Sequence, residues 1–383
     1  MFRFLTAGES HGKALNIILE GIPSGLEISV EDIAIELSRR RLGYGRGPRM
    51  RFEQDEIEIL GGVRHGVTLG SPISVVIYNS EWPKWETEMS PGPGSSDKKL
   101  TQPRPGHADF IGMRKYDLDD ARNVLERASA RETAARVTVG AISKKLIAQL
   151  GTQIMSHVVS IGEARVSDGA AQPTFQDLNI IDENEVRCFD QISSEKMIAE
   201  IKAAAKVGDS LGGVCEILGF GVREGLGSHI QWDRKIDGLL SQALMSIQAI
   251  KAVEIGDGFD NAYRRGSLAH DEILYRDNHY VRPTSRAGGV EGGMTNGALL
   301  VARIWMKPLA SLNRPSIRTT DVVTHQETVS FKERTDVTAV PAAGVVGETM
   351  IAITLASESI KKFGGDSMKE FLTNANNFSD SLD

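Results

Sequence analysis

The sequence predicts a single large domain, residues 1–383, that mixes α-helices and β-strands. Three observations predict this class. Helical and strand-like segments alternate irregularly, without the regular βα units of about 30 residues that build a Rossmann fold. Hydrophobic residues make up 40% of the chain, which is enough for a large core. No change in composition marks a linker between two cores, and no heptad or short tandem repeat occurs.

Hydrophobic periodicity places the regular elements. Apolar runs of strand length predict strands at residues 14–22, 57–60, 73–78, 154–161, 214–221 and 298–306. Apolar residues at helical spacing predict helices at residues 29–43, 129–150, 194–207, 233–247 and 341–363.

Start and stop signals bound these helices. Ser29 and Asp32 resemble a capping box, Ser129 and Glu132 form a full one, and Asp233 is the expected cap of a further helix. Glycines follow the predicted ends of three helices, at Gly43, Gly151 and Gly208.

Four stretches are predicted to lack long regular elements. Residues 80–105 hold five prolines, and we expect a mobile surface loop that acts as a lid. Residues 163–191 read as a polar connector, and residues 287–297 are rich in glycine. The polar tail at 364–383 is expected to be frayed.

Composition limits the classes of function. The net charge of −7 means that any anion site must be a local basic cluster. Cys188 and Cys215 form neither a metal motif nor a disulfide framework, which is typical of a reducing cytoplasm. We see no signal peptide and no stretch near the roughly 18 apolar residues that span a bilayer, so we expect no membrane partner.

The segment from Arg39 to Arg51 is the most informative stretch of the sequence. It gathers arginines around three glycines and a proline. Arginine forks match phosphate and carboxylate oxygens, and glycine allows the backbone to come close to a ligand. A solvated basic loop and a nucleic-acid patch are the alternatives. The second is disfavoured because the chain is acidic and the segment has no aromatic residue besides Tyr44.

Two glycine–histidine turns suggest acid–base chemistry. His11 lies in the turn Gly8–Gly12, and His107 lies in the stiff segment Gln102–Asp109. A histidine in a restrained turn can donate or accept a proton near neutral pH. Exposed structural turns are the alternative for both. A third segment, Arg127–Thr133, begins a long helix whose N-terminus would attract anions, although simple capping explains it equally well.

Three weaker signals lie in the C-terminal half. Gly288–Gly293 is glycine-rich but does not follow a Rossmann strand, so it suggests only close backbone contact with a planar ligand. Lys307–Ser311 and Arg334–Asp336 add cations and an acid. The remaining histidines show no metal-ligand spacing and are interpreted as structural or surface residues: His65, His157, His229, His270, His279 and His325.

Taken together, these segments resemble the chorismate synthase family almost from end to end. The blocks that carry the resemblance are Gly8–Gly12 with Glu20–Pro23, Arg127–Thr133, Arg334–Asp336 with Gly347-Glu348, Gln102–Asp109, Val253–Phe259 and Arg286–Val290. The resemblance implies an α+β fold, a β-α-β sandwich in which helices lie between two antiparallel sheets. It also implies a cytoplasmic homotetramer.

The resemblance further implies a lyase that needs reduced FMN. The reaction is a 1,4-anti elimination of phosphate from 5-enolpyruvylshikimate 3-phosphate, which gives chorismate without net redox change. The flavin is reduced either by NADPH on this protein or by a separate flavin reductase.

The resemblance implies catalytic roles for His11, His107, Asp336, Ser10 and Ser129. His11 would protonate the departing phosphate, and His107 would stabilise reduced flavin near its N1. Asp336 would help flavin N5 to accept a proton, and the two serines would belong to the proton relay.

The same resemblance implies the binding residues. The substrate would be held by Arg40, Arg46, Arg49, Arg104 and Arg131. Flavin would contact Arg127, Ala128, Ser129, Gln248, Ala249, Gly292, Lys307, Pro308, Leu309, Ala310, Ser311 and Arg334. Arg40 and Arg46 are also expected to bind NADPH if the protein reduces its own flavin, and no metal site is expected.

The chain departs from the family pattern in two places. Many members have Gly-Gly-Arg-Ser where Leu125-Glu126-Arg127-Ala128 stands, and asparagine is common at the position of Gln248. Two rival functions remain at this point. One is an NADPH-dependent flavin reductase, and the other is a nucleic-acid-binding module that uses Arg39–Arg51.

Overall fold

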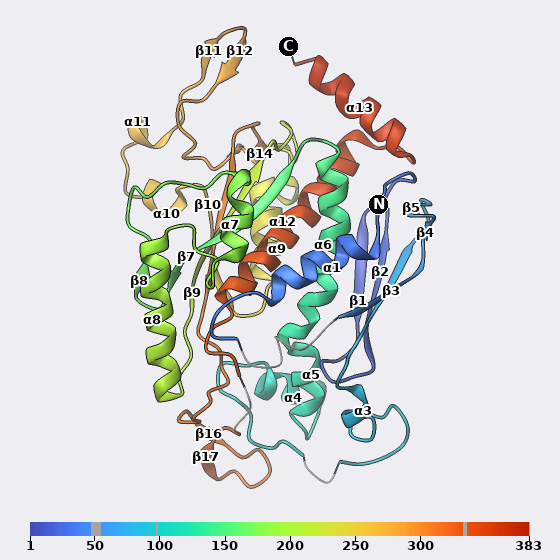
Figure 1. The fold of residues 1–383 in the computed structure, drawn as a ribbon, viewed down its shortest axis with the longest axis vertical. Helices are drawn as coiled ribbons and strands as arrows, with labels where there is room; N and C mark the ends of the chain where they lie inside the picture. The colour runs from blue at the N-terminus through green and yellow to red at the C-terminus, as the bar shows by residue number, and fades with distance from the viewer. Residues whose placement is uncertain (47–54, 97–98, 332–334, 383) are drawn as a thin grey trace.

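Two antiparallel sheets enclose a layer of long helices in the computed structural model, which describes residues 1–46, 55–96, 99–331 and 335–382 (Figure 1). In spatial order, the strands of the first sheet are β1 (Arg3–Ala7), β2 (Ala14–Glu20), β6 (Ile73–Tyr78) and β3 (Glu56–Gly61). Those of the second sheet are β10 (Ile250–Ile255), β15 (Leu300–Met306), β9 (Gly213–Phe220), β7 (Gln153–Ile161) and β8 (Ala164–Arg165). The six predicted strands are confirmed within one or two residues.

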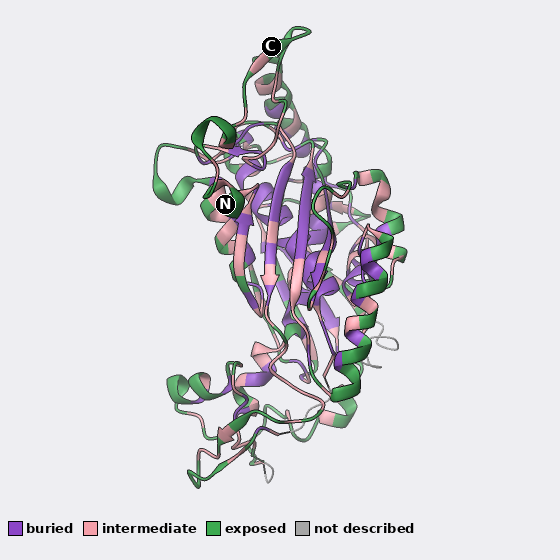
Figure 2. Ribbon diagram, turned by 90° about the vertical axis from the view of Figure 1, so that its left-hand side faces the viewer, coloured by how far each residue is buried: buried purple, intermediate pink, exposed green. Residues whose placement is uncertain are grey.

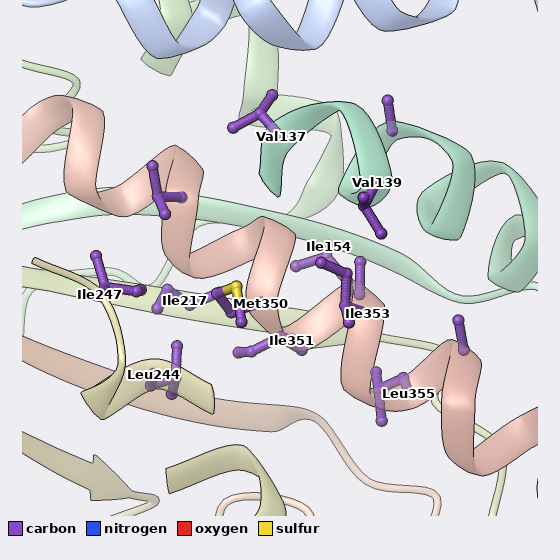
Figure 3. Close-up of a cluster of buried hydrophobic side chains, with 14 of the residues drawn as sticks. Val137, Val139, Ile154, Ile217, Leu244, Ile247, Met350, Ile351, Ile353 and Leu355 are labelled. Atoms are coloured by element: carbon purple, nitrogen blue, oxygen red, sulfur yellow. The ribbon is translucent and has the colours of Figure 1, made fainter. Parts of the chain in front are cut away.

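The helical layer holds most of the core. Helices α1 (Val30–Arg41) and α6 (Thr133–Ala148) face the first sheet, and α12 (Val340–Phe363) and α9 (Ile236–Met245) face the second. Figure 3 shows apolar side chains of α6 and α12 meeting those of β7, β9 and α9. Figure 2 shows that buried residues follow the strands of the second sheet, whereas the loops at both ends are exposed. The β-α-β sandwich is therefore confirmed.

Helix α12 corrects one expectation. By length and composition it could cross a membrane, contrary to the prediction that no segment comes near that limit. However, 94% of its apolar window is buried inside the protein. A helix that packs against a sheet and other helices on all sides is apolar all round for that reason.

Two predicted helix starts were wrong and one is confirmed. Ser29 and Asp32 form the full capping box of α1. Ser129 instead accepts a hydrogen bond from the backbone of Arg131 at the start of a 3₁₀ turn, and α6 begins only at Thr133. Asp233 lies inside another 3₁₀ turn, and α9 begins at Ile236.

The failed capping box has a physical reason. The Glu132 carboxylate accepts hydrogen bonds from Thr6, Arg136 and Gln248 instead of turning back to the helix start. Arg136 is one helical turn away, but Thr6 and Gln248 are distant in the sequence, so their competition could not be read from local spacing.

Two stretches that were predicted to be irregular contain helices. The connector at 163–191 holds α7 (Leu178–Glu183), whose Ile181 belongs to a small second core. The tail predicted to be frayed forms α13 (Met368–Asp380), capped by Ser367 and Glu370. Phe371 is fully buried and contacts Phe363 at a ring-centroid distance of 6.0 Å. Tertiary packing, rather than composition, orders both segments.

The remaining elements are short, apart from α8 (Gln191–Val207), which packs beside β7 and β8. They are β4 (Val63–Arg64), β5 (Val67–Thr68), α3 (Trp82–Trp85), α4 (Asp109–Tyr116), α5 (Arg122–Ala128), α10 (Gly258–Asn261), α11 (Gly266–Ala269), β11 (Leu274–Arg276), β12 (His279–Val281), β13 (Val290–Glu291), β14 (Met294–Thr295), β16 (Arg318–Thr320) and β17 (Glu327–Val329). The loop at 80–105 is irregular outside α3 in its described part. Residues 97 and 98 lie outside the described residues, and mobility stays a prediction.

A buried ion network joins the central helices. Arg39 of α1 donates to both oxygens of Glu348 on α12, at 2.7 and 3.0 Å, and Lys144 of α6 donates to Glu348 at 2.7 Å. Arg187 and Ser156 also donate to this carboxylate. Burial alone would raise the pKa of the Glu348 carboxyl, but the surrounding cations hold it well below its usual range.

Candidate active site

Most of the predicted site segments meet at one end of the molecule. This is the end where α6 and α12 begin and where α4 and α5 lie (Figure 1). The turn before β2, the start of α6 and the segment after β15 converge there, although they lie far apart in sequence. The contacts below show how each segment is held.

His11 is fixed by a carboxylate that the sequence reasoning did not assign. The His11 backbone N–H donates to Glu126 Oε2 at 2.8 Å, and its Nδ1 lies 2.9 and 3.0 Å from the two carboxylate oxygens. The Glu126 side chain is 1% exposed. Burial would raise the pKa of Glu126, but hydrogen bonds from His11 and the charge of Arg122 lower it instead. The carboxylate is therefore ionised at neutral pH.

Two further side chains complete the surroundings of this histidine. The Trp85 ring lies 4.1 Å from the His11 ring, centroid to centroid, and comes from the predicted lid at 80–105. The Arg122 guanidinium lies 4.9 Å from the centre of the Trp85 ring and donates to Glu126 at 2.9 Å. The lid segment and α5 thus meet at His11.

The predicted serines and one predicted arginine lie beside this histidine. Ser129 Oγ donates to Ser10 Oγ at 3.3 Å. Arg131 donates to Asp55 at 2.6 Å and to Asn79 at 3.1 Å, and Asn79 in turn donates to the backbone oxygen of Gly12. Arg131 is therefore tied to the His11 turn, and part of its positive charge is balanced by Asp55.

His107 forms a second carboxylate-supported group. Its Nδ1 lies 2.5 Å from Asp109 Oδ1, and Arg104 donates to the same carboxylate at 2.8 Å. Asp109 is completely buried. Burial opposes ionisation of Asp109, but His107 and Arg104 outweigh it and lower the pKa of Asp109 to about 2. The ionised Asp109 carboxylate and the Arg104 guanidinium, whose Nη2 lies 3.1 Å from His107 Nδ1, together hold the His107 ring in place.

The segment Lys307–Ser311 connects this second group to the rest of the site. Ser311 accepts a hydrogen bond from Arg104 at 2.8 Å, and the Lys307 ammonium donates to the carbonyl of Gly106. The Lys307 backbone N–H donates to the carbonyl of Ala249 at 3.0 Å. Ala249 has a φ of 66°, which is uncommon for alanine and marks a specifically held turn.

Gln248 and Arg127 are linked by way of Thr6 and Glu132. Gln248 donates to Glu132 at 3.2 Å, whereas its side-chain oxygen is buried without a hydrogen-bond partner among the described residues. Arg127 donates to the backbone and hydroxyl oxygens of Thr6 and to the carbonyl of Gly8. Ala128 follows Arg127 at the end of α5. The predicted flavin contacts at 127–129 and 248–249 are thus brought together through Glu132.

The basic segment after α1 joins the same end of the molecule. Arg46 forms an ion pair with Asp336, with Nε 2.8 Å from Oδ2, and Arg40 donates to Thr133 at 3.4 Å. Val337 binds Gly45 through its backbone, and Leu211 binds Val337. Next to Leu211, Ser210 donates to the carbonyl of Leu309 at 2.8 Å, in the segment that also holds Pro308 and Ala310.

Two predicted site residues, Arg49 and Arg334, lie outside the described residues. A third, Gly292, is not part of this cluster. Gly292 lies between β13 and β14, near the other end of the molecule (Figure 1). Gln248 and Ala249 lie at one end of β10, because Ile250 follows them and pairs with Met306. The glycine-rich segment lies beyond the other end of β10, where Gly288 contacts Gly256. Gly292 therefore cannot contact a ligand at Gln248 of the same chain as the chain is folded here.

A cavity of about 500 Å³ adjoins the His11 turn. Its walls are formed by the turn, by β2 and β6, and by the lid, and they include Glu9, Lys13, Tyr78, Trp82 and Met89. A second cavity of about 530 Å³ lies near the β11–β12 hairpin, and none of the predicted site residues lines it. The first cavity is the one that the predicted catalytic turn borders.

Sequence reasoning missed the acidic partners of the predicted bases and cations. They are Asp55, Asp109 and Glu126. Asp109 had a local signal, because it follows His107 by two residues in the same restrained segment. Asp55 and Glu126 had none, because their partners are distant in the sequence.

The other histidines agree with the structural or surface interpretation. His157 is buried and lies 3.1 Å from Glu216. The remaining five are exposed in the structure. Both cysteines are buried free thiols. Among the described residues, no group of three histidine, cysteine or acidic side chains could hold a metal ion.

Comparisons with known proteins agree on one family. A family model described as chorismate synthase matches residues 2–360. A chorismate synthase of Salinispora tropica is 55% identical over 391 aligned positions, covering 100% of this chain and 99% of the relative. One of Leifsonia xyli is 52% identical and covers 100% of this chain and 96% of the relative. A crystal structure of a chorismate synthase matches with a TM-score of 0.80 and 42% identity, covering 100% of this chain and 98% of that one.

Proposed function

The chain belongs to the chorismate synthase family, and from this premise we propose that it eliminates phosphate from 5-enolpyruvylshikimate 3-phosphate in a site that contains reduced FMN. As a member of this family it is a lyase of aromatic amino acid biosynthesis, and the family implies a reduced flavin cofactor. The observation that carries the proposal is the meeting of two carboxylate-supported histidines and several arginines at one end of the helical layer.

The chemistry of the proposed substrate requires these residue types. It carries a phosphate and carboxylates, so it needs fixed cations that do not have to reorganise during the reaction. Arg40, Arg46, Arg104 and Arg131 lie in the cluster as held side chains. The departing phosphate takes up a proton near neutral pH, and His11 is the group proposed to donate it.

The residues present fit a flavin phosphate and ring. Lys307 and Arg127 donate to carbonyl and hydroxyl oxygens in the described structure, which leaves their positive charge available to an anion. The buried, unpartnered oxygen of Gln248 is suited to an N–H donor such as the ring amide of a flavin. When bound, reduced flavin would supply electron density to the substrate. The residues proposed to hold it are those of 127–129, 248–249 and 307–311.

His107 and Asp336 are proposed as the proton-handling residues on the flavin side. His107 is oriented by Asp109, and Asp336 is paired with Arg46 at 2.8 Å. Because Arg46 and Asp336 form one ion pair, a ligand that binds Arg46 would also lie close to the Asp336 carboxylate. NADPH binding by Arg40 and Arg46, or supply of reduced flavin by a separate reductase, stays a proposal.

The assembly is also a proposal. We infer a homotetramer in the cytoplasm, with no nucleic acid and no membrane as partner. The position of Gly292 supports more than one subunit. If this glycine contacts flavin, the flavin must be held by the 127–129 and 248–249 segments of another copy.

The main test measures phosphate release. Under anaerobic conditions with photoreduced FMN, the protein is expected to release one phosphate for each 5-enolpyruvylshikimate 3-phosphate consumed, without net oxidation of the flavin. The assay is then repeated with FMN and NADPH in the dark, which tests whether the protein reduces its own flavin. Steady NADPH oxidation without phosphate release would identify the protein as a flavin reductase and reject the proposal.

A second prediction concerns Arg46. Replacing Arg46 by alanine is expected to weaken substrate affinity more than FMN affinity, because a charge-assisted hydrogen bond to phosphate or carboxylate contributes about 1.5–3 kcal/mol. Fluorescence titration of FMN and a KM measurement compare the two ligands. Exposed Arg114 serves as the control in Arg114→Ala. Equal losses for both ligands would contradict the assignment of Arg46 to the substrate.

A further inference from the structure

The contacts of Glu126 with His11 go beyond what a helix residue needs for packing. One carboxylate binds both the backbone N–H and the ring Nδ1 of His11, at distances of 2.8 to 3.0 Å. The carboxylate is almost completely buried, whereas the His11 side chain is 14% exposed. The ring is therefore held from the protein side and reaches the surface of the site on its other side.

We propose that Glu126 is a positioning residue that fixes the tautomer and orientation of His11, so that His11 exchanges its proton through Nε2. This inference rests on the proposed role of His11 as proton donor. An ionised carboxylate is an acceptor only, so the ring must place a proton on Nδ1 to bind it. Proton exchange is then directed to Nε2, as in other sites where a carboxylate orients a functional histidine.

The charged residues around His11 predict the direction in which each substitution shifts the pH dependence of turnover. Glu126 places a negative charge beside the His11 ring, and Arg122 places a positive charge on the same carboxylate, at 2.9 Å. Both residues come from α5. Trp85 of α3 covers the ring, and Ser10 precedes His11 in the same turn. Glu126 and Arg122 should therefore shift the pH dependence of turnover in opposite directions.

The first experiment compares Glu126→Gln and Arg122→Gln in the phosphate-release assay with photoreduced FMN. Glu126→Gln is expected to lower kcat on the order of 10- to 100-fold with little change in KM. It should also move the alkaline decline of turnover to lower pH, because an anion beside the His11 ring is removed. Arg122→Gln should move the same decline to higher pH, because a competing cation is removed.

A matched control is available on the second sheet. His157 and Glu216 form another buried histidine–glutamate pair, at 3.1 Å, outside the proposed site. Glu216→Gln is expected to leave the pH dependence of turnover unchanged. A kcat loss in Glu126→Gln without a shift of the alkaline decline, or shifts of equal sign in the two α5 variants, would show a merely structural role and overturn the proposal.

A second measurement does not depend on turnover. Nitrogen NMR of histidine-labelled protein reports which ring nitrogen carries the proton, and the His11 signal is assigned by its absence in His11→Ala. We expect the Nδ1–H form in the unmodified protein and a mixture of tautomers in Glu126→Gln. An unchanged His11 tautomer in Glu126→Gln would overturn the inference even if phosphate release is normal. Failure of the unmodified protein to release phosphate would instead reject the proposed function.

Discussion

Replacing either His11 or His107 by alanine is expected to give a folded protein that has lost most of its turnover. General acid–base groups typically contribute a factor of about 10² to 10⁴ to the rate. Both side chains lie at the edge of the site and are partly exposed, so neither fills the hydrophobic core. Stopped-flow measurement of phosphate release with photoreduced FMN gives the rate, and circular dichroism checks the fold.

Each variant leaves a buried carboxylate that still has a cationic partner. Without His11, Glu126 keeps Arg122 as a partner, and without His107, Asp109 keeps Arg104. Because each buried carboxylate retains a cation, the loss of stability should be small. His229→Ala, at an exposed position outside the site, is the control for the substitution itself. A variant of His11 or His107 that keeps a rate near that of the unmodified protein would show that its assigned role is wrong.

The sequence suggested candidate site residues, but it did not suggest the contacts between them. Arginines and histidines near glycines could be selected because their chemistry suits anions and protons. Their grouping was inferred from the family resemblance, since nothing local relates His11 to position 126 or Arg131 to Asp55. These acidic partners emerge only when α5 packs against the turn before β2, and when the start of β3 meets the 3₁₀ turn before α6. Glu126 and Asp109 matter, because they are the carboxylates that hold the rings of His11 and His107.

For the fold too, the sequence predicted local features but not the packing between distant segments. Strands and long helices were predicted from apolar periodicity, which is a local property. The helix after Gly364 was missed because most of its surface is polar and only three of its residues are buried, including Phe371. The ordering of two sheets around a helical layer could not be derived from periodicity either, since it depends on which apolar faces meet. That part of the prediction came from the resemblance.

Replacing Glu348 by alanine is expected to cause the largest loss of stability among the substitutions considered. Glu348 is completely buried and accepts hydrogen bonds from Arg39, Lys144 and Arg187. Its removal leaves buried cations with less compensating charge. Removing one partner of a buried ion pair costs about 3–5 kcal/mol, because the remaining charge stays desolvated. Urea denaturation followed by circular dichroism should show a clearly lower midpoint.

The matched control for this substitution is Glu327→Ala. Glu327 pairs with Arg318 between β16 and β17, but both side chains are more than 70% exposed. Exposed ion pairs contribute little because water already solvates both charges. The denaturation midpoint should therefore remain close to that of the unmodified protein. If Glu348→Ala changed the midpoint as little as Glu327→Ala, the ion network would not be what holds α1, α6 and α12 together. The apolar contacts between these helices would then account for the stability of the helical layer.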